Sequence, residues 1–457
     1  MNEKKIIEGR WRIFGRNSKW EYGILNYDPK DGLTLKIKIP KSRTFEEIVR
    51  GQIKRRSIPE TVYGFDQNNN PVTLFGCGGF TRGGGGGLQQ HGISAMRALI
   101  GGHYPKWGAV KFKTVSCKYT LLSSWINRRP IDRVSFAGQP PRIGDDVPRE
   151  IRVRLQNGVL LKIGEQLRVE TTYSKHCFEG DHYIKFQFAE TVPISEILDK
   201  FLLPFQHLLT LFTGRRIYPQ EIKFAIEDSD FPESIELLME NTGIEEANTT
   251  DNGSFMSVQF SQVEHEIESI MQRWYSYYND LNSVLNLFFT TMFNDGLYLN
   301  HQFLLLAQAF EVYHNRHKNF SSYASNPNSF KRRISRVKKR VNKLDGEWLE
   351  EKLHYANQKT LANRLKDILN LHPVEVKKLI RNKHVFADKI RYTRNYYTHF
   401  DEKLKSRGKI ATETELLPMT IKMQALLKIC IFKDLGITGK PIDEIIRGTK
   451  DLYIIKL

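Results

Sequence analysis

Cysteine is scarce in this chain. Its 457 residues include four cysteines, Cys77, Cys117, Cys177 and Cys430, which lie far apart and never form a C-x-x-C pair. Disulfide scaffolds need several cysteines at close spacing, and zinc ribbons need two C-x-x-C pairs. The spacing therefore argues against both classes and is typical of a protein from a reducing compartment.

Long hydrophobic runs are also missing. The sequence MNEKKIIEGRWRIF at the start lacks the apolar core of a signal peptide. No uninterrupted apolar run approaches the ~20 residues that a membrane-spanning helix needs. Hydrophobic residues make up 40% of the chain and charged residues 26%, as in folded globular proteins. These features predict a cytoplasmic protein with no membrane segment.

Positive charge is absent from one long segment. Residues 224–272 contain twelve Asp or Glu and no Lys or Arg. Because the whole chain carries a formal charge of +18, the remainder carries +30. A surplus of that size favours a polyanionic partner such as RNA, since phosphates attract Lys and Arg. The alternative is a basic protein whose lysines are simply solvated.

The first part of the chain has the pattern of an antiparallel sheet. Several segments alternate apolar with polar or basic residues at a period of two, among them LTLKIKIP, GAVKFKTVSCKYTLL, EIRVRLQNGVLLKI and HYIKFQFAE. Turn sequences such as YDPKDG and DQNNNP separate them. We predict a β-rich domain over residues 1–193, with one face of its sheet buried.

Glycine is concentrated in residues 76–92, GCGGFTRGGGGGLQQHG. A phosphate-binding loop needs Lys and Ser or Thr after its last glycine and a helix that supplies amide donors. Here Leu88, Gln89 and Gln90 follow instead. The sequence therefore favours a flexible surface loop, which could still become ordered on a ligand.

The rest of the chain is mainly helical in pattern. Residues 194–214 have the pattern of a helix that stops at Gly214, and EIKFAI returns to strand. The acidic sequence NTGIEEANTTDNGS (241–254) is the predicted hinge. Helical spacing dominates from about residue 262 onward. We predict an α+β multidomain protein with a connecting segment at 194–261 and an all-α domain at 262–457.

One predicted helix, KRRISRVKKRVNKL (331–344), is densely cationic. Its apolar residues share one face: Ile334, Val337, Val341 and Leu344. A phosphate backbone is the natural partner of the other faces. We therefore predict that this helix binds RNA through Arg332, Arg333, Arg336, Lys338, Lys339 and Arg340. A solvated helix, or one that faces an acidic partner, is the alternative.

Thirteen histidines raise the question of a metal. His314 and His317 lie three apart on a predicted helix, and His176, Cys177 and His182 cluster near a predicted strand. Neither group has a second ligand pair at a recognisable spacing. We therefore predict no metal site.

A helix predicted over residues 385–400 has two distinct sides. At ~100° per residue, a mainly apolar stripe is made of Phe386, Ile390, Thr393, Tyr397 and Phe400. The other side, within roughly 140°, holds Arg391, Arg394, Asn395, Thr398 and His399. Arg394 and His399 are five residues apart and cannot superpose on an ideal helix. A joint role for them needs a groove, a frayed helix end or a second subunit.

Such a polar face could cleave RNA. Histidine exchanges a proton near neutral pH, and arginine holds a phosphate together with its developing charge. The 2′-hydroxyl of the substrate is then the nucleophile, so the scheme needs no metal. An ordinary solvated helix face often has the same spacing, and it stays open as the alternative.

The sequence RNYYTHF (394–400) resembles the signature of the HEPN superfamily of helical ribonucleases and nucleotide-binding domains. That signature has Arg, a polar residue and then His near a helix end. FLLLAQAFEVYHNR, which contains Glu311, and TLANRLKDIL are similar to helices of ApeA-type HEPN domains. GRWRIFG, GILNYDPKDGLTLKI and IGGHYPKWGAVKFKTVSCKYTLLSSWI are similar to the β-rich domain that precedes HEPN in these proteins. The resemblance covers most of the chain.

The resemblance implies a bacterial abortive-infection factor whose ribonuclease cuts cellular RNA, tRNA in particular, after a phage-derived trigger. It implies metal-independent cleavage without a cofactor, and a homodimer or higher oligomer with Arg and His of both copies in one cleft.

By the same resemblance, Arg394 stabilises the scissile phosphate and His399 is the general acid or base. Asn395 positions the substrate or the histidine, and Glu311 orients Arg394, although Glu311 could equally be a surface acid at a helix end. Arg391 and Thr398 are expected to bind RNA beside them.

Two other functions stay open. The helical half could be a non-catalytic module that binds RNA or nucleotide and mediates dimerisation. The glycine-rich segment, which has no counterpart in the family pattern, could belong to an infection sensor.

Overall fold

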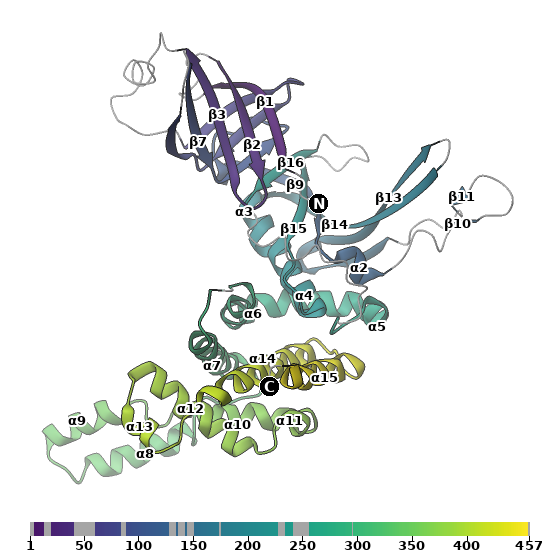
Figure 1. Ribbon diagram of the computed structural model, residues 1–457. Coiled ribbons are helices and arrows are strands. Elements are labelled where there is room, and N and C mark those ends of the chain that lie inside the picture. Colours follow the sequence, from purple (N-terminus) through teal and green to yellow (C-terminus); the bar gives the residue numbers. More distant parts are fainter. Residues whose placement is uncertain are drawn as a thin grey trace. The chain divides into compact units, whose positions relative to one another are not determined.

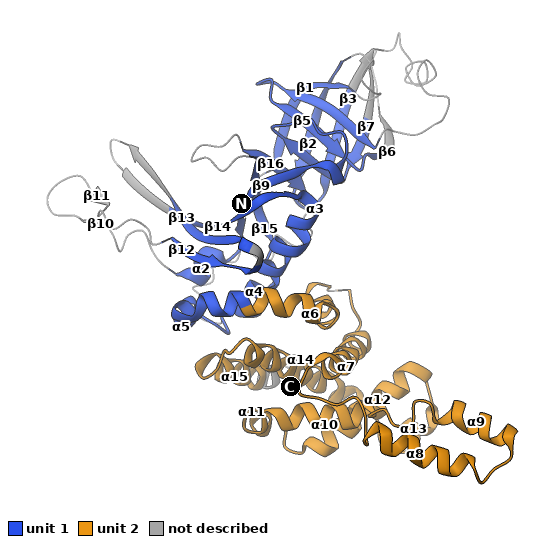
Figure 2. Ribbon diagram, turned by 180° about the vertical axis from the view of Figure 1, so that it is seen from behind, with its two compact units in different colours: residues 1–272 blue, residues 273–457 orange. Residues whose placement is uncertain are grey.

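The structure, a computed structural model, describes residues 4–12, 20–40, 60–83, 88–127, 134–135, 142–143, 150–172, 175–226, 234–240, 256–294 and 296–455. The chain divides into two compact units, residues 1–272 and 273–457 (Figure 2). The first is rich in strands and the second is helical (Figure 1). The predicted hinge at 241–254 lies outside the described residues. In the part of the chain that the structure describes, no helix is both long and apolar enough to cross a membrane.

The first unit is built on one large antiparallel sheet. Fourteen of the described strands pair in the order β12-β13-β14-β9-β15-β16-β8-β5-β4-β1-β2-β3-β7-β6. They are β1 (Lys5–Arg12), β2 (Glu21–Asp28), β3 (Gly32–Pro40), β4 (Thr61–Asp66), β5 (Pro71–Phe75), β6 (Gly78–Gly83), β7 (Leu88–Ala95), β8 (Arg97–Ile100), β9 (Lys111–Tyr119), β12 (Ile151–Arg154), β13 (Leu160–Thr172), β14 (Lys175–Pro193), β15 (Pro219–Ala225) and β16 (Ile235–Met239). A separate pair joins β10 (Val134–Ser135) and β11 (Arg142–Ile143). The predicted β-rich antiparallel half is confirmed.

One side of β1–β5, with β7 and β8, forms a hydrophobic core, as the period-two pattern predicts. Leu33, Leu35 and Ile37 of β3 are buried in it beside Trp11. The indole of Trp11 packs against Gly64, where an added Cβ would come within 2.3 Å of the ring. Glycine is therefore required at this position by close packing.

The glycine-rich segment forms most of a hairpin. β6 and β7 pair antiparallel, with Arg82 opposite His91 and Gly83 opposite Gln90. Residues 84–87 lie outside the described residues. The prediction of a surface loop is thus wrong for β6 and β7, which lie on either side of residues 84–87. Ladder hydrogen bonds join backbone groups, so glycines can take part in them despite their conformational freedom.

Helices in the first unit connect its strands. The predicted helix at 194–214 is confirmed, and it consists of α3 (Ile194–Ile197), a π-helical turn (Leu198–Leu202) and α4 (Leu203–Thr213). Gly214 ends it with a φ of 72°, the left-handed conformation that favours glycine. The predicted return to strand at EIKFAI is β15. Short helical segments lie at α2 (Leu122–Ile126), α5 (Phe260–Val263), Trp107–Ala109, Gln156–Gly158 and Glu264–Glu266.

The second unit is helical, which confirms the predicted fold class. α6 (Ile267–Phe293) leads into α7 (Leu299–Arg316), α8 (Pro327–Lys338), α9 (Lys343–Leu353), α10 (Leu361–Leu371), α11 (Pro373–Leu379), α12 (Lys383–His399), α13 (Glu402–Ser406), α14 (Glu413–Asp434) and α15 (Lys440–Ile455). α7 packs against α10, α12 and α14, and α10 also packs against α12. The helices with the predicted catalytic residues, α7 and α12, thus pack directly against each other.

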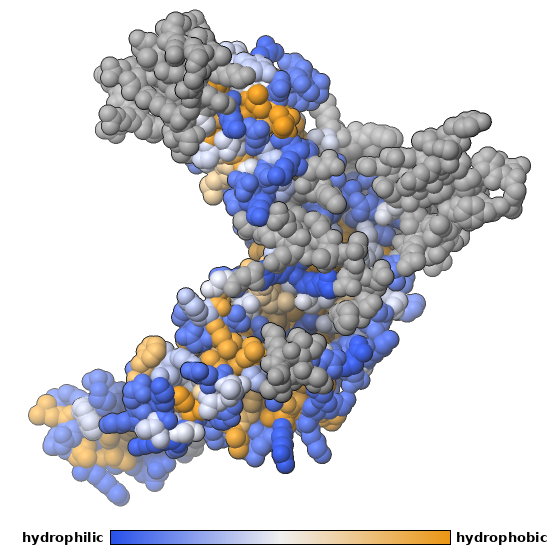
Figure 3. Space-filling model, viewed as in Figure 1, coloured by the Kyte–Doolittle hydropathy of each residue, from blue (hydrophilic) through white to orange (hydrophobic). Residues whose placement is uncertain are grey.

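The predicted basic helix is shorter than expected. α8 ends at Lys338, and Asn342 begins α9 because its side chain accepts a hydrogen bond from the N–H of Asp345 at 2.8 Å. Val341 and Leu344 therefore lie outside α8, and both are exposed. The prediction that all four apolar residues share one face of a single helix is therefore wrong. Figure 3 shows hydrophobic patches among hydrophilic residues over this α8–α9 hairpin, at the lower left.

Candidate active site

Helix α12 carries the polar side that the sequence analysis singles out. Asn382 caps its first turn and accepts hydrogen bonds from the backbone N–H groups of His384 and Val385, both at 3.1 Å. Neither Pro nor Gly interrupts residues 383–399. The helix can therefore run unbroken to His399, with a buried side made of Ala387, Ile390 and Thr393.

The predicted apolar stripe is only partly buried. Ile390 and Thr393 are inaccessible to solvent, and Phe386 and Tyr397 are half-buried. Phe400, by contrast, is 65% exposed. Its place in the stripe is wrong, because α12 ends one residue earlier and Phe400 turns out of the helix with a φ of 50°.

Arg394 contacts an acid from a neighbouring helix. Its Nη2 lies 3.4 Å from Oε2 of Glu311 on α7, and its Nη1 lies 3.4 Å from Oδ1 of the adjacent Asn395. The Arg394 side chain is 35% exposed and that of Glu311 26% exposed. The structure thus brings together three of the four predicted catalytic residues and leaves the guanidinium accessible to a ligand.

His399 is the last residue of α12 and is exposed. Its ring makes no hydrogen bond or ion pair with any other described residue. Asn395 contacts Arg394 and not His399. Within the described part of one chain, His399 therefore makes no contact with the Arg394–Glu311 pair. This agrees with the five-residue step between Arg394 and His399, which places the two side chains at different angles around the helix.

The two predicted RNA-binding residues on α12 make local contacts. Nη2 of Arg391 lies 3.9 Å from Oδ1 of Asp388, and its guanidinium lies 4.3 Å from the centre of the Tyr392 ring. The hydroxyl of Thr398 donates to the carbonyl of Arg394 at 2.8 Å. Neither side chain is buried, so both remain accessible from outside the bundle.

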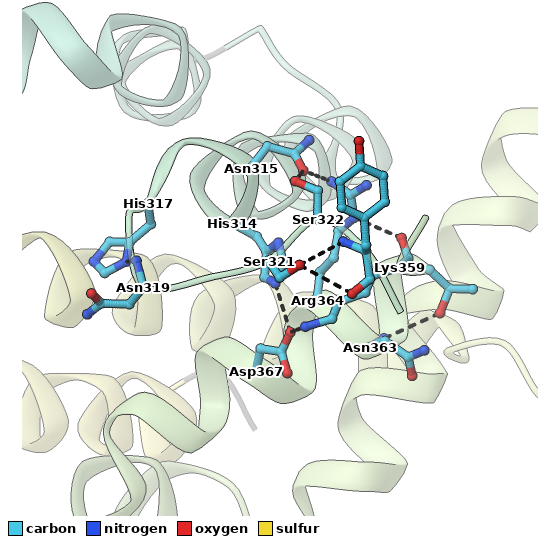
Figure 4. A network of polar contacts seen from close by, with 12 residues as sticks. His314, Asn315, His317, Asn319, Ser321, Ser322, Lys359, Asn363, Arg364 and Asp367 are labelled. Carbon is cyan, nitrogen blue, oxygen red and sulfur yellow. Dashed lines mark hydrogen bonds and ion pairs between the residues drawn. The ribbon is translucent and has the colours of Figure 1, made fainter. Parts of the chain in front are cut away.

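Arg364 on α10, which the sequence analysis does not single out, holds the α7 segment that contains Glu311. It is only 7% exposed. Its Nε donates to the carbonyl of Lys359 at 2.9 Å, and its Nη1 donates to Oδ1 of Asn315 (Figure 4). The same Nη1 lies 3.4 Å from the carbonyl of Glu311. A sequence signal was present, because Arg364 lies on the apolar side of α10, where a cation needs partners.

His314 lies in the same network and is fully buried. Its Nε2 lies 2.8 Å from Oδ2 of Asp367, which also accepts from Nζ of Lys359 at 2.6 Å (Figure 4). Burial lowers the pKa of His314. Burial also acts to raise the pKa of Asp367, but the hydrogen bonds from Lys359 and His314 outweigh it and hold that pKa below its usual value.

The two candidate metal ligands at the end of α7 face different acids. Nε2 of His317 lies 3.3 Å from Asp434, whereas His314 faces Asp367. The side chains of His176 and Cys177 are outside those described. Among the residues that the structure describes, there is no group of three or more His, Cys, Asp or Glu placed to hold a metal ion.

Most of the predicted RNA-binding cations are free of protein partners. Lys338 contacts Glu350 of α9. No ion pair with another described residue is made by Arg332, Arg333, Arg336, Lys339 or Arg340, all of which are exposed. They lie on α8 and the turn after it, where an external polyanion can reach them.

A second basic segment, which the sequence analysis also missed, follows His399 directly. Four cations at alternate positions are exposed: Lys403, Lys405, Arg407 and Lys409. Nζ of Lys409 lies 5.0 Å from the centre of the Tyr392 ring, so the segment folds back along α12. The run EKLKSRGK was the available signal.

Two family models match the chain. The ApeA N-terminal domain 1 matches residues 6–274, and the Apea-like HEPN domain matches residues 304–441. Comparison with curated proteins gives no significant match, and comparison with solved structures gives none either. Glu311, Arg394, Asn395 and His399 all lie within the HEPN match. The chain therefore belongs to the ApeA-type HEPN proteins, a defence-related nuclease family.

Proposed function

We propose that the protein is a HEPN endoribonuclease that acts in the cytoplasm in anti-phage defence, with tRNA as its expected substrate. The contact between Arg394 and Glu311 supports this most, because an acid beside a phosphate-binding guanidinium can hold it in one orientation. Arg394, Asn395 and His399 also follow one another on α12 in the order of the HEPN signature.

In the proposed reaction, the 2′-hydroxyl oxygen attacks the adjacent phosphorus and the bond from phosphorus to the 5′ oxygen breaks. His399 accepts the proton of the 2′-hydroxyl or donates one to the departing 5′ oxygen. Arg394 stabilises the negative charge that develops on the phosphoryl oxygens. The products are a 2′,3′-cyclic phosphate and a 5′-hydroxyl, and the scheme involves no metal or cofactor.

The proposed active form is a homodimer or higher oligomer. In the described part of a single chain, His399 makes no contact with Arg394 or Glu311. A second copy against the exposed end of α12 would add its own Arg394 and His399 to the same cleft. That arrangement would supply both a charge-stabilising arginine and a proton-transfer histidine to one phosphate.

RNA would be bound mainly through its phosphates. Arg391 and Thr398 would contact the backbone next to the scissile bond. Further along the RNA, the proposed contacts are the cations of the α8–α9 hairpin: Arg332, Arg333, Arg336, Lys338, Lys339 and Arg340. Such contacts release counterions, so affinity should fall steeply with salt.

The β-rich unit is proposed to control the nuclease in response to a phage-derived trigger. The glycine-rich hairpin of β6 and β7 is a candidate contact for that trigger. Deletion of residues 82–88 should then abolish the triggered response in infected cells and leave the basal ribonuclease activity of the purified protein unchanged.

Cleavage of purified tRNA in EDTA tests the proposed function. The wild-type protein should cut it, and His399→Ala and Arg394→Ala should each abolish cutting while the circular dichroism spectrum stays that of the wild type. Full activity in both variants would sink the assignment.

One observation favours a second function, that of a non-catalytic module that binds RNA or nucleotide and mediates dimerisation. The guanidinium of Arg394 is engaged by Glu311 and Asn395, and His399 is apart from them. This alternative predicts salt-sensitive RNA binding, no cleavage under any trigger, and loss of binding when Lys338, Lys339 and Arg340 are neutralised together.

A further inference from the structure

Phe400 has an unfavourable backbone conformation. It follows His399 with φ 50° and ψ 42°, in the left-handed region. In the described part of the second unit, every other residue with positive φ is a glycine. Helices commonly end with glycine or asparagine at such a position, since a Cβ there crowds the following carbonyl. A bulky aromatic residue at this position is therefore an outlier, and such outliers cluster at functional sites.

Packing does not offset this strain. The Phe400 side chain is 65% exposed. Its ring contacts the edge of Tyr396, with centroids 5.9 Å apart, and Tyr396 in turn contacts Tyr397 at 5.2 Å. Tyr397 lies 6.3 Å from Phe303 of α7. The aromatic side chains thus form a row that is anchored in the bundle at one end and opens to solvent at Phe400.

The surroundings of this row are cationic. The basic segment after His399 contributes Lys403, Lys405, Arg407 and Lys409, all exposed. The two acids in the segment have local partners: Asp401 accepts from the N–H of Lys403 at 3.0 Å, and Glu402 accepts from the hydroxyl of Tyr396 at 3.4 Å. An exposed aromatic ring among cations that make no ion pair with another described residue is typical of single-stranded nucleic acid sites.

We propose that Phe400, supported by Tyr396, is a nucleobase-stacking subsite next to His399. This inference rests on the proposed function: an unpaired base beside the scissile phosphate would stack on the Phe400 ring while nearby cations hold the backbone. The substrate class is then RNA that is single-stranded at the cleavage point. A second copy lies against the end of α12 in the proposed dimer, but the cations Lys403, Lys405, Arg407 and Lys409 favour RNA, rather than the surface of another basic chain, as the group that covers the Phe400 ring.

Binding of a short single-stranded RNA with a fluorescent base tests the subsite. All variants are made in the full-length His399→Ala protein, so that RNA is not cut. Phe400→Gly should weaken binding about 5- to 150-fold, the equivalent of 1–3 kcal/mol for one stacked base. Phe400→Trp should bind as tightly as Phe400 or more tightly. Phe400→Leu, which keeps apolar bulk but no flat ring, should behave like Phe400→Gly. Binding of fully duplex RNA should be the same in all four proteins.

Stability separates this role from a structural one. Phe400→Gly relieves the backbone strain, so its melting temperature should stay the same or rise by about 2–4 °C. A lower melting temperature together with unchanged RNA binding would overturn the proposal, and so would full binding by Phe400→Leu. A smaller sedimentation coefficient for Phe400→Gly would also overturn it, because the ring would then be covered by a second copy.

The same Phe400 substitutions, made in the protein that keeps His399, distinguish the subsite from the proposed nuclease. Wild-type protein that binds the RNA through Phe400 but never cuts it would refute the nuclease and keep the subsite. If the Phe400→Gly variant cuts RNA at the same rate as the wild-type protein, the subsite is refuted and the nuclease is kept.

Discussion

Replacement of Glu311 by Gln isolates the charge that lies beside Arg394. Gln has almost the same shape, so the 3.4 Å contact loses mainly its ionic component. The two side chains are 26% and 35% exposed, and solvent screens the pair. The free energy of unfolding should therefore fall by no more than about 1 kcal/mol. Activity should change more, because a misplaced Arg394 stabilises the reacting phosphate poorly: we expect kcat/KM to fall about 10- to 100-fold.

The assay compares cleavage of end-labelled tRNA with unfolding in urea. Glu444→Gln is a matched control, because Glu444 is also 26% exposed and pairs with an arginine, Arg447 of α15. It should show the same small change in stability and no change in cleavage rate. If Glu311→Gln cuts tRNA as fast as the wild type, Glu311 does not hold Arg394 for catalysis.

Three further predictions concern the helical unit. Arg364→Met removes the hydrogen bonds that a cation only 7% exposed makes to Lys359, Glu311 and Asn315, and it should lower the free energy of unfolding by about 1–3 kcal/mol in urea, whereas exposed Arg447→Met should change it little. Replacing Arg332, Arg333 and Arg336 together with Gln should reduce the slope of log Kd for RNA against log salt by about 2; an unchanged slope would exclude α8 from the interface. Because burial lowers the pKa of His314, unfolding takes up a proton below about pH 6.5, so stability is full above that pH and falls below it. His314→Gln should flatten this fall between about pH 7.5 and pH 5.5, and an unchanged fall would assign it to other groups.

Periodicity predicts features that depend on one surface of one element. The segments with period two became β3, β9, β13 and β14, since alternation reflects which face of a strand is buried. The polar side of α12 followed from helical spacing in the same way. Helical spacing does not predict the contact between Glu311 and Arg394, because the two residues lie 83 positions apart on different helices. It was expected only through resemblance to HEPN domains.

The features that the sequence analysis missed depend on local backbone turns and on contacts between elements. Helical spacing places Asn342 inside one basic helix, but its side chain caps a new helix, so the predicted helix is divided in two. The same spacing makes Phe400 one more helical position, whereas the chain leaves the helix there. The resemblance places Arg364 in a helix of the HEPN domain, but its contact with α7 depends on how α10 packs against α7, which the sequence does not show.

The chemistry of the product ends tests the central claim most directly. RNA fragments made by the purified wild-type protein in EDTA are analysed by mass spectrometry, beside those made by His399→Ala. We expect 2′,3′-cyclic phosphate and 5′-hydroxyl ends from the wild type and no fragments from His399→Ala. Fragments with 3′-hydroxyl and 5′-phosphate ends, or identical fragments from both proteins, would contradict a site in which His399 moves the proton and the 2′-hydroxyl attacks.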